Sequence, residues 1–139
     1  MGAAALLGAG ALLASCGGEA KAPKPQGRTI VATYSLLGSV VRELAGDAFE
    51  VKVSIPNGLD PHEWEPSAKD IQLLQGADLI VENGLGLEEG MSKALDAARA
   101  KGLRFFTASD HVTVRRVGAG EGIPSGDRDQ AVGARDPHL

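Results

Sequence analysis

Two copies of the triplet Asp-Pro-His occur in this chain of 139 residues, although the chain has only three histidines. They stand at residues 60–62 and 136–138. Proline fixes its own φ and pushes the residue before it towards extended conformations, so the proline-bracketed run 60–66 holds its imidazole on a stiff loop. Neutral imidazole is a preferred ligand of zinc and other first-row divalent ions. The repeated triplet therefore makes His62 and His138 candidate metal ligands.

Each triplet also carries a carboxylate two residues before its histidine. Asp60 and Asp136 are candidates to steady the loop or to accept the second ring N–H of the imidazole. A tetrahedral zinc site needs about four protein ligands, so two histidines supply half of one. Other polar residues nearby are given simpler roles. Glu63 and Glu65 are interpreted as solvated carboxylates, and Trp64 as a packing residue at the base of the loop.

The elements that must position these loops alternate between strands and helices. Apolar runs predict buried strands at residues 29–34 and 77–82, and a further strand is predicted at 103–107. An alternating run predicts a strand nearer an edge at 49–55. Helical periodicity predicts helices over 36–45, between Ser67 and Gly76, and over 87–101, with Ser35 and Ser67 as N-caps. This order predicts an α/β fold, with a parallel four-stranded sheet flanked by helices. Ligand loops of such sheets lie beyond the carboxyl ends of the strands, where the first triplet stands.

The helical period also predicts which side chains of two helices share a face. In the first helix these residues are Leu37, Val40, Val41 and Leu44. In the third helix the residues expected to point inward are Met91, Ala94, Leu95 and Ala98.

The composition restricts the class of protein. Hydrophobic residues at 43% and charged residues at 23% are ordinary for a globular protein, and the length suits one domain with its own core. The net charge is -4, so no basic field indicates a nucleic-acid partner. His111 is expected to be exposed and to bind no metal. The single cysteine, Cys16, cannot form an internal disulfide or a metal-binding cluster.

The N-terminal residues predict an export signal. Residues 3–14 form an apolar run that is too short to span a bilayer, and small residues and Cys16 follow it. Residues 13–16 resemble the bacterial lipobox, which implies cleavage before Cys16 and its acylation. Residues 1–16 are therefore interpreted as a lipoprotein-type signal segment. The alternative is a buried helix of Ala and Leu with an inert cysteine.

The remaining chain divides by composition. Residues 17–27, rich in Gly, Pro, Lys and Ala, are interpreted as a flexible linker. Residues 28–117 carry the alternating strands and helices and form an α/β lobe. Residues 118–139 are expected to form a mobile loop that leads to the second triplet, because residues 118–135 contain hardly any apolar side chains.

Several short stretches within residues 29–117 are characteristic of one family. They are Tyr34-Ser35, Ala45-Gly46, Asp60-Pro61-His62-Glu63-Trp64-Glu65-Pro66-Ser67, Asp70-Ile71, Ala77-Asp78-Leu79-Ile80 and Asn83-Gly84-Leu85-Gly86-Leu87-Glu88. In this order they resemble the zinc and manganese solute-binding proteins of bacterial ABC importers. The resemblance implies two similar α/β lobes, joined by one long helix, with the metal ion between them.

The resemblance also implies a role for particular residues. His62 matches the first histidine ligand of the family and His138 the second, so the chain corresponds to the first lobe. The second lobe, which supplies a His or Glu and an acidic residue, has no counterpart in this sequence. The implied protein is periplasmic or on the cell surface, tethered to the membrane through Cys16, and monomeric. It is not an enzyme: it binds zinc or manganese and delivers the ion to a membrane permease.

Alternatives from other classes remain. An adhesion or structural lipoprotein of the same family, or a non-functional truncated remnant, would have the same sequence features. A zinc hydrolase is disfavoured because its ligands usually stand close together on a helix, as in H-E-x-x-H. The loop 118–135 contains acidic residues but no histidine, which disfavours a dedicated zinc-scavenging loop. The choice between zinc and manganese stays open.

Overall fold

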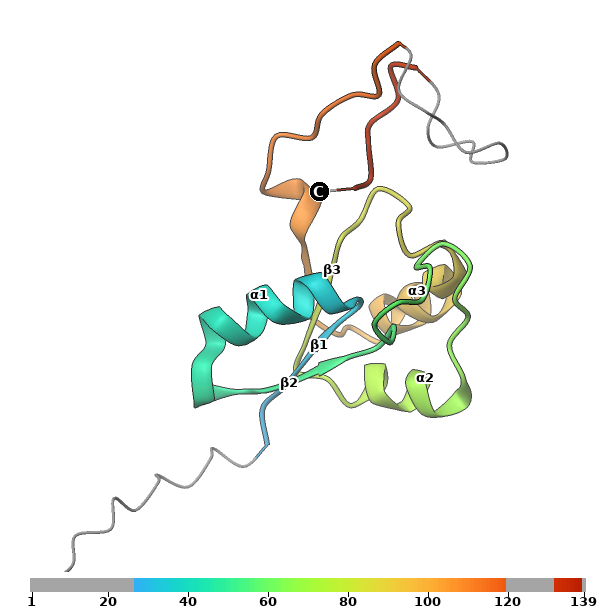
Figure 1. Ribbon diagram of the computed structural model, residues 1–139. Coiled ribbons are helices and arrows are strands. Elements are labelled where there is room, and N and C mark those ends of the chain that lie inside the picture. Colours follow the sequence, from blue (N-terminus) through green and yellow to red (C-terminus); the bar gives the residue numbers. More distant parts are fainter. Residues whose placement is uncertain (1–26, 120–131, 139) are drawn as a thin grey trace, which may run out of the picture.

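The fold, seen in a computed structural model that describes residues 27–119 and 132–138, is built on a four-stranded sheet (Figure 1). The strands lie in the order β2-β1-β3-β4, and all three pairs are parallel. The elements are β1 (Thr29–Ala32), α1 (Ser35–Ala45), β2 (Glu50–Val53), α2 (Ala68–Gln75), β3 (Leu79–Glu82), α3 (Ser92–Ala100) and β4 (Phe105–Thr107). Short 3-10 helices cover Gly46–Ala48, Glu89–Met91 and Ala108–Asp110. The predicted parallel α/β fold is confirmed.

The helices cover the two faces of the sheet unequally. Figure 1 shows α1 on one side and α2 and α3 on the other. Successive side chains of a strand point to opposite faces. Accordingly Val31 joins the core under α2 and α3, whereas Ala32, the next residue of β1, lies towards Gly38 of α1. The strand β2 lies at an edge, as its alternating sequence predicts.

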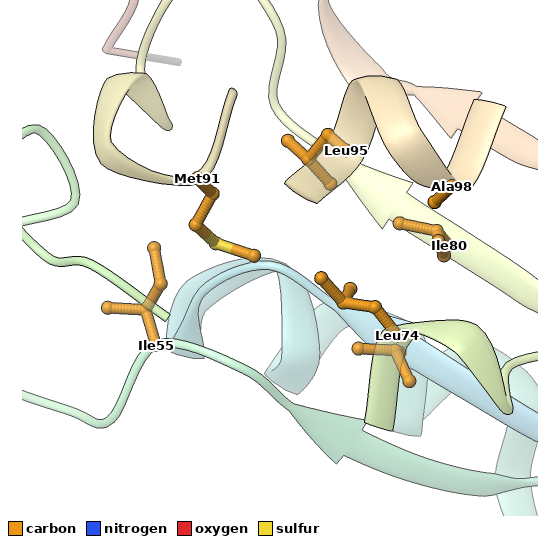
Figure 2. Close-up of a cluster of buried hydrophobic side chains, with 7 residues drawn as sticks. Ile55, Leu74, Ile80, Met91, Leu95 and Ala98 are labelled. Carbon is orange, nitrogen blue, oxygen red and sulfur yellow. The ribbon is translucent and has the colours of Figure 1, made fainter. Parts of the chain in front are cut away.

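The main core fills the space between the sheet and the helices α2 and α3 (Figure 2). Its fully enclosed side chains are Val31, Ile55, Leu74, Ile80, Met91, Leu95 and Ala98. The partly buried Trp64 packs against this cluster. The loop that carries His62 therefore rests on the core through Trp64, which confirms the packing role predicted for the tryptophan.

The two predicted serine caps behave differently. Ser67 caps α2 in a full capping box, accepting a bond from the backbone N–H of Asp70, whose carboxylate accepts from the N–H of Ser67. Ser35 does not cap α1, contrary to the prediction: the helix begins at Ser35 itself, and Tyr34 occupies the N-cap position without a side-chain bond. The Ser35 hydroxyl instead donates to Asn57 Oδ1 at 3.2 Å.

The side of α1 that packs against the sheet also differs from the prediction. A glycine, and not the apolar residues, determines which side this is. Gly38 is buried against the sheet so closely that a Cβ there would lie within 3.0 Å of the Val53 side chain. The helix therefore turns its Gly38 side to the sheet. Val40 and Leu44, predicted to share the apolar face, are 47% and 82% exposed.

The third helix begins later than predicted. Residues 89–91 form a 3-10 helix, and the α-helix starts only at Ser92. Backbone contact explains the irregular start, because a Cβ on Gly90 would lie within 3.0 Å of the Trp64 carbonyl oxygen. Met91, Leu95 and Ala98 are nevertheless buried, as the helical period predicts.

The segment after β4 leads away from the sheet and returns to it. Val117 N–H donates to the Ala134 carbonyl at 3.0 Å, and Gly133 N–H donates to the Val117 carbonyl at 2.8 Å. The two ends of the predicted loop are thus paired in a short antiparallel ribbon, which Figure 1 shows beyond the carboxyl ends of the strands. Residues 120–131 of that loop lie outside the described part, as do residues 1–26, which include the predicted signal segment and all of the linker except Gly27.

A buried carboxylate joins the ends of the two central strands. Glu88, 5% exposed, accepts bonds through Oε1 from the Thr33 hydroxyl and the Asn83 N–H, both at 2.6 Å. Its Oε2 accepts from the Gly84 N–H at 3.3 Å. Burial raises the pKa of Glu88 above its usual value, although the bonds from Thr33 and Asn83 act in the opposite direction.

Replacing Gly90 by Ala should destabilise the fold. The added methyl group would press on the Trp64 carbonyl, and overpacking of this kind costs about 1–3 kcal/mol. Urea denaturation measures the loss. Gly76→Ala is the matched control, because a Cβ there meets its nearest atoms at ordinary contact distance, 3.6 Å. Equal unfolding free energies for the two variants would contradict the close approach at Gly90.

Replacing Glu88 by Gln should change the pH dependence of stability. Because the folded-state pKa of Glu88 is raised, its contribution is fully present below the unfolded value of 4.5 and is lost as pH rises through the folded value. In Glu88→Gln this loss is absent, so its unfolding free energy should fall less than that of the wild type on raising the pH. Urea denaturation at several pH values from about 4 to about 8 tests this. The exposed Glu43→Gln should keep the wild-type profile, and an identical profile for Glu88→Gln would refute the expectation.

Candidate metal centre

The structure brings the two predicted histidine ligands together. His62 lies in the loop between β2 and α2, and His138 lies at the end of the returning ribbon. Their ring centroids are 5.6 Å apart, with the ring planes inclined at 57°. Two imidazoles from segments far apart in the sequence thus lie close together.

The two triplets form the same local turn. The N–H of His62 donates to Asp60 Oδ1 at 2.9 Å, and the N–H of His138 donates to Asp136 Oδ1 at 3.0 Å. In an Asx turn, the side chain of Asp accepts a bond from the backbone N–H two residues later, and both triplets contain this bond. Both aspartates therefore steady the backbone that presents the following imidazole.

Asp136 also contacts the imidazole ring of His138. Its Oδ1 lies 3.1 Å from His138 Nδ1, and its Oδ2 accepts a bond from Arg115 Nε at 2.7 Å. The backbone N–H of His138, with further contributions from the His138 ring and Arg115, lowers the pKa of Asp136 below its usual value. The carboxylate is thus held in its charged form next to Nδ1.

The Nε2 atom of His62 is buried, and within the described part of the chain it has no hydrogen-bond partner. Burying a polar nitrogen without a partner costs about 1–3 kcal/mol, so native structures rarely leave one unless a ligand or water meets it. The His138 side chain is 53% exposed. One imidazole therefore has an enclosed ring nitrogen, whereas the other is half exposed to solvent.

Asn83, at the carboxyl end of β3, holds the segment that carries His138. Its side chain donates from Nδ2 to the carbonyl oxygens of Pro137 at 2.7 Å and Gly84 at 3.0 Å. Its Oδ1 accepts from the Tyr34 hydroxyl at 3.3 Å. The sequence analysis gives Asn83 no role beyond its place in the family stretch at residues 83–88. The signal that could have found it is its place directly after a strand parallel to the one before the His62 loop.

Other sequence candidates do not complete a metal site in the described part of the chain. In residues 27–119 and 132–138 no group of three or more His, Cys, Asp or Glu side chains is arranged to hold a metal ion. His111 is exposed and stacks on Phe106, with ring centroids 4.5 Å apart. Glu63 and Glu65 are exposed, as predicted. Cys16 lies outside the described residues. None of the helices in the described residues has the length and apolar character that a membrane span requires.

A curated relative resembles the chain in sequence. The manganese ABC transporter substrate-binding lipoprotein PsaA of Streptococcus mitis is 34% identical over 108 residues, which are 74% of this chain and 35% of that protein. The chain thus spans about a third of the length of this relative.

The structural likeness covers the described fold. A metal-free mutant of the periplasmic metal binding protein from Candidatus Liberibacter asiaticus gives a TM-score of 0.62 at 27% identity, over 80% of this chain and 38% of that one. The periplasmic zinc binding protein TroA from Treponema pallidum gives 0.60 at 28% identity, over 67% and 34%. Such partial coverage is expected for one lobe of a two-lobed receptor.

The match to a family is direct and extends across the lobe and both triplets. Residues 30–139 match the family described as zinc-uptake complex component A, periplasmic. This confirms the resemblance to metal solute-binding proteins, and the chain belongs to the zinc-uptake complex component A family.

Proposed function

We propose that the chain is the metal-binding first lobe of an extracytoplasmic solute-binding component of an ABC importer. It captures a divalent transition metal ion, zinc or manganese, and passes it to a membrane permease. The observation that carries the proposal is the pair of imidazoles 5.6 Å apart, one of which has a buried ring nitrogen without a partner among the described residues.

The hydrogen bonds favour one way of presenting the metal. We assign the proton of the neutral His138 ring to Nδ1, because the Asp136 carboxylate lies within hydrogen-bond distance of that atom, and this leaves Nε2 with a free lone pair. Nε2 is also the unpartnered atom of His62. Both rings then offer the same nitrogen to the ion, and the charged Asp136 makes the His138 ring a better donor to a cation.

The proposed site binds the metal ion and releases it, and no covalent bond is made or broken. Two imidazoles hold an ion weakly, because zinc takes about four protein ligands. The remaining ligands are proposed to come from a second lobe, in keeping with a relative of which this chain matches only 35% of the length. Manganese appears in the name of PsaA and zinc in that of TroA, so either ion fits the proposal.

The location follows from the N-terminal residues. We infer that residues 1–16 form a signal, that Cys16 becomes the acylated N-terminus, and that residues 17–27 space the lobe, which begins at residue 28, from the membrane. PsaA is by name a lipoprotein. The protein would then act as a tethered monomer beside its permease. No observation favours the adhesion or remnant alternative.

Replacing either imidazole should weaken zinc binding. Losing an outer-shell partner typically costs about 10- to 100-fold in metal affinity, so losing a ligand should cost at least about tenfold. The measurement is a zinc titration of purified His62→Ala and His138→Ala chains in competition with a chromophoric chelator. His111→Ala is the matched control and should bind as the wild type does. Wild-type affinity in His62→Ala would refute the proposed site.

Replacing Cys16 by Ala should abolish lipid attachment. The chain has a single cysteine, so no other thiol can take the acyl group. Expression in a bacterium supplied with labelled palmitate should label the wild type and Ser15→Ala, but not Cys16→Ala. Equal labelling of all three chains would place the anchor elsewhere and contradict the tether through Cys16.

A further inference from the structure

The distance between the two imidazoles needs a physical cause, because the chain leaves the sheet after β4 and reaches His138 only at the end of the returning ribbon (Figure 1). We infer that Asn83 is the positioning residue for His138: its carboxamide holds the Pro137 carbonyl and so fixes where the second imidazole stands relative to His62. This inference rests on the proposed function, in which both imidazoles bind the metal.

The bond between Asn83 and Pro137 is short and enclosed. Asn83 is 0% exposed, Pro137 is fully buried, and Nδ2 donates to the Pro137 carbonyl at 2.7 Å. Proline has no backbone N–H, so its carbonyl is the polar group through which this residue's backbone can be held. Because His138 comes directly after that carbonyl, fixing it fixes the start of the His138 residue.

The chemistry at this position requires a carboxamide. Asn83 donates twice, to the carbonyls of Pro137 and Gly84, and accepts once, from the Tyr34 hydroxyl. An ionised carboxylate only accepts, so aspartate would set a negative charge against two carbonyl oxygens. The side chains of serine and alanine are too short to reproduce the three bonds.

Asn83 is itself held from three sides, which makes it a rigid support. Its N–H donates to Glu88 Oε1 at 2.6 Å, and its carbonyl accepts from the Ser109 N–H at 3.0 Å. The bond from Tyr34 fixes the plane of the amide. The bond from Asn83 to the Pro137 carbonyl therefore fixes the position of the second triplet relative to β1, β3 and β4.

The ribbon alone gives a weaker constraint. It connects residues 115–117 with residues 133–136, and among its bonds the Asp136 N–H donates to the Arg115 carbonyl at 3.0 Å. Both of its sides lie beyond the sheet, so their mutual pairing does not set the distance from His62. The Asn83 bond joins residues 54 apart in sequence and ties the ribbon to the sheet.

The test replaces Asn83 by Asp, a change of nearly equal size that removes the donor. Zinc affinity of the purified chain, measured in competition with a chromophoric chelator, should fall about tenfold, the scale of an outer-shell loss. Asn57→Asp makes the same chemical change at an exposed position and should leave zinc affinity unchanged. Wild-type affinity in a folded Asn83→Asp chain would overturn the inference.

A double-mutant cycle with His138→Ala separates positioning from general stability. If Asn83 acts through His138, then Asn83→Asp should cause no further loss of zinc affinity in the His138→Ala background. An equal loss in both backgrounds would show an effect on the whole fold and overturn the inference. Circular dichroism and urea denaturation of each variant establish that the chains compared are folded.

A milder variant decides the question if Asn83→Asp does not fold. Tyr34→Phe removes the hydroxyl that fixes the amide plane but leaves the Pro137 contact possible. Its zinc affinity should fall by less than tenfold, about two- to fivefold, and this loss too should vanish with His138→Ala. A loss that persists in that background would overturn the inference.

The same measurements distinguish failure of this inference from failure of the proposed function. If His62→Ala and His138→Ala bind zinc as the wild type does, the proposed site itself is wrong. If both lose affinity while a folded Asn83→Asp chain does not, the two histidines bind the metal and only the positioning role of Asn83 is refuted.

Discussion

All four strands run in the same direction, and the rest of the structure depends on this constraint. Parallel strands end at one edge of the sheet, so the residues that follow them are collected there whatever their distance in sequence. Thr33 and Tyr34 follow β1, the His62 loop follows β2, Asn83 follows β3 and Ser109 follows β4. The bonds among these residues are therefore bonds between neighbouring strand ends.

This edge is polar yet enclosed, which is costly unless each group has a partner. The Glu88 carboxylate is satisfied by a hydroxyl and two backbone N–H groups, and the Asn83 amide by three oxygen atoms. Such a network is rigid because moving one member would leave another buried and unpaired. His62 Nε2, by contrast, is buried without a partner among the described residues, and it is the atom proposed to meet an incoming ion.

The sequence predicts the sheet and the paired triplets because their causes are local. Apolar runs separated by helical periods define a parallel sheet, and Asp-Pro-His encodes its own turn, which the structure repeats at His62 and His138. The face of α1 could not be predicted from its apolar period, since one close contact at Gly38 overrides the larger side chains.

The contacts of Asn83 and Glu88 could not be predicted from the sequence for a related reason. A polar residue after a strand has the same appearance in the sequence whether it faces solvent or closes a buried network. Their partners, Pro137 and Thr33, are remote in the sequence, so only the folded chain brings them into contact. Whether His62 and His138 bind a metal ion remains a prediction that their proximity supports.

The pairing of Val117 with residues 133 and 134 has a consequence for where the second triplet lies. The ends of the connecting stretch are fixed beside each other, and the following proline is fixed to the sheet. The place of the second triplet is therefore set by these contacts among described residues, and not by the number of residues that separate the two paired sides.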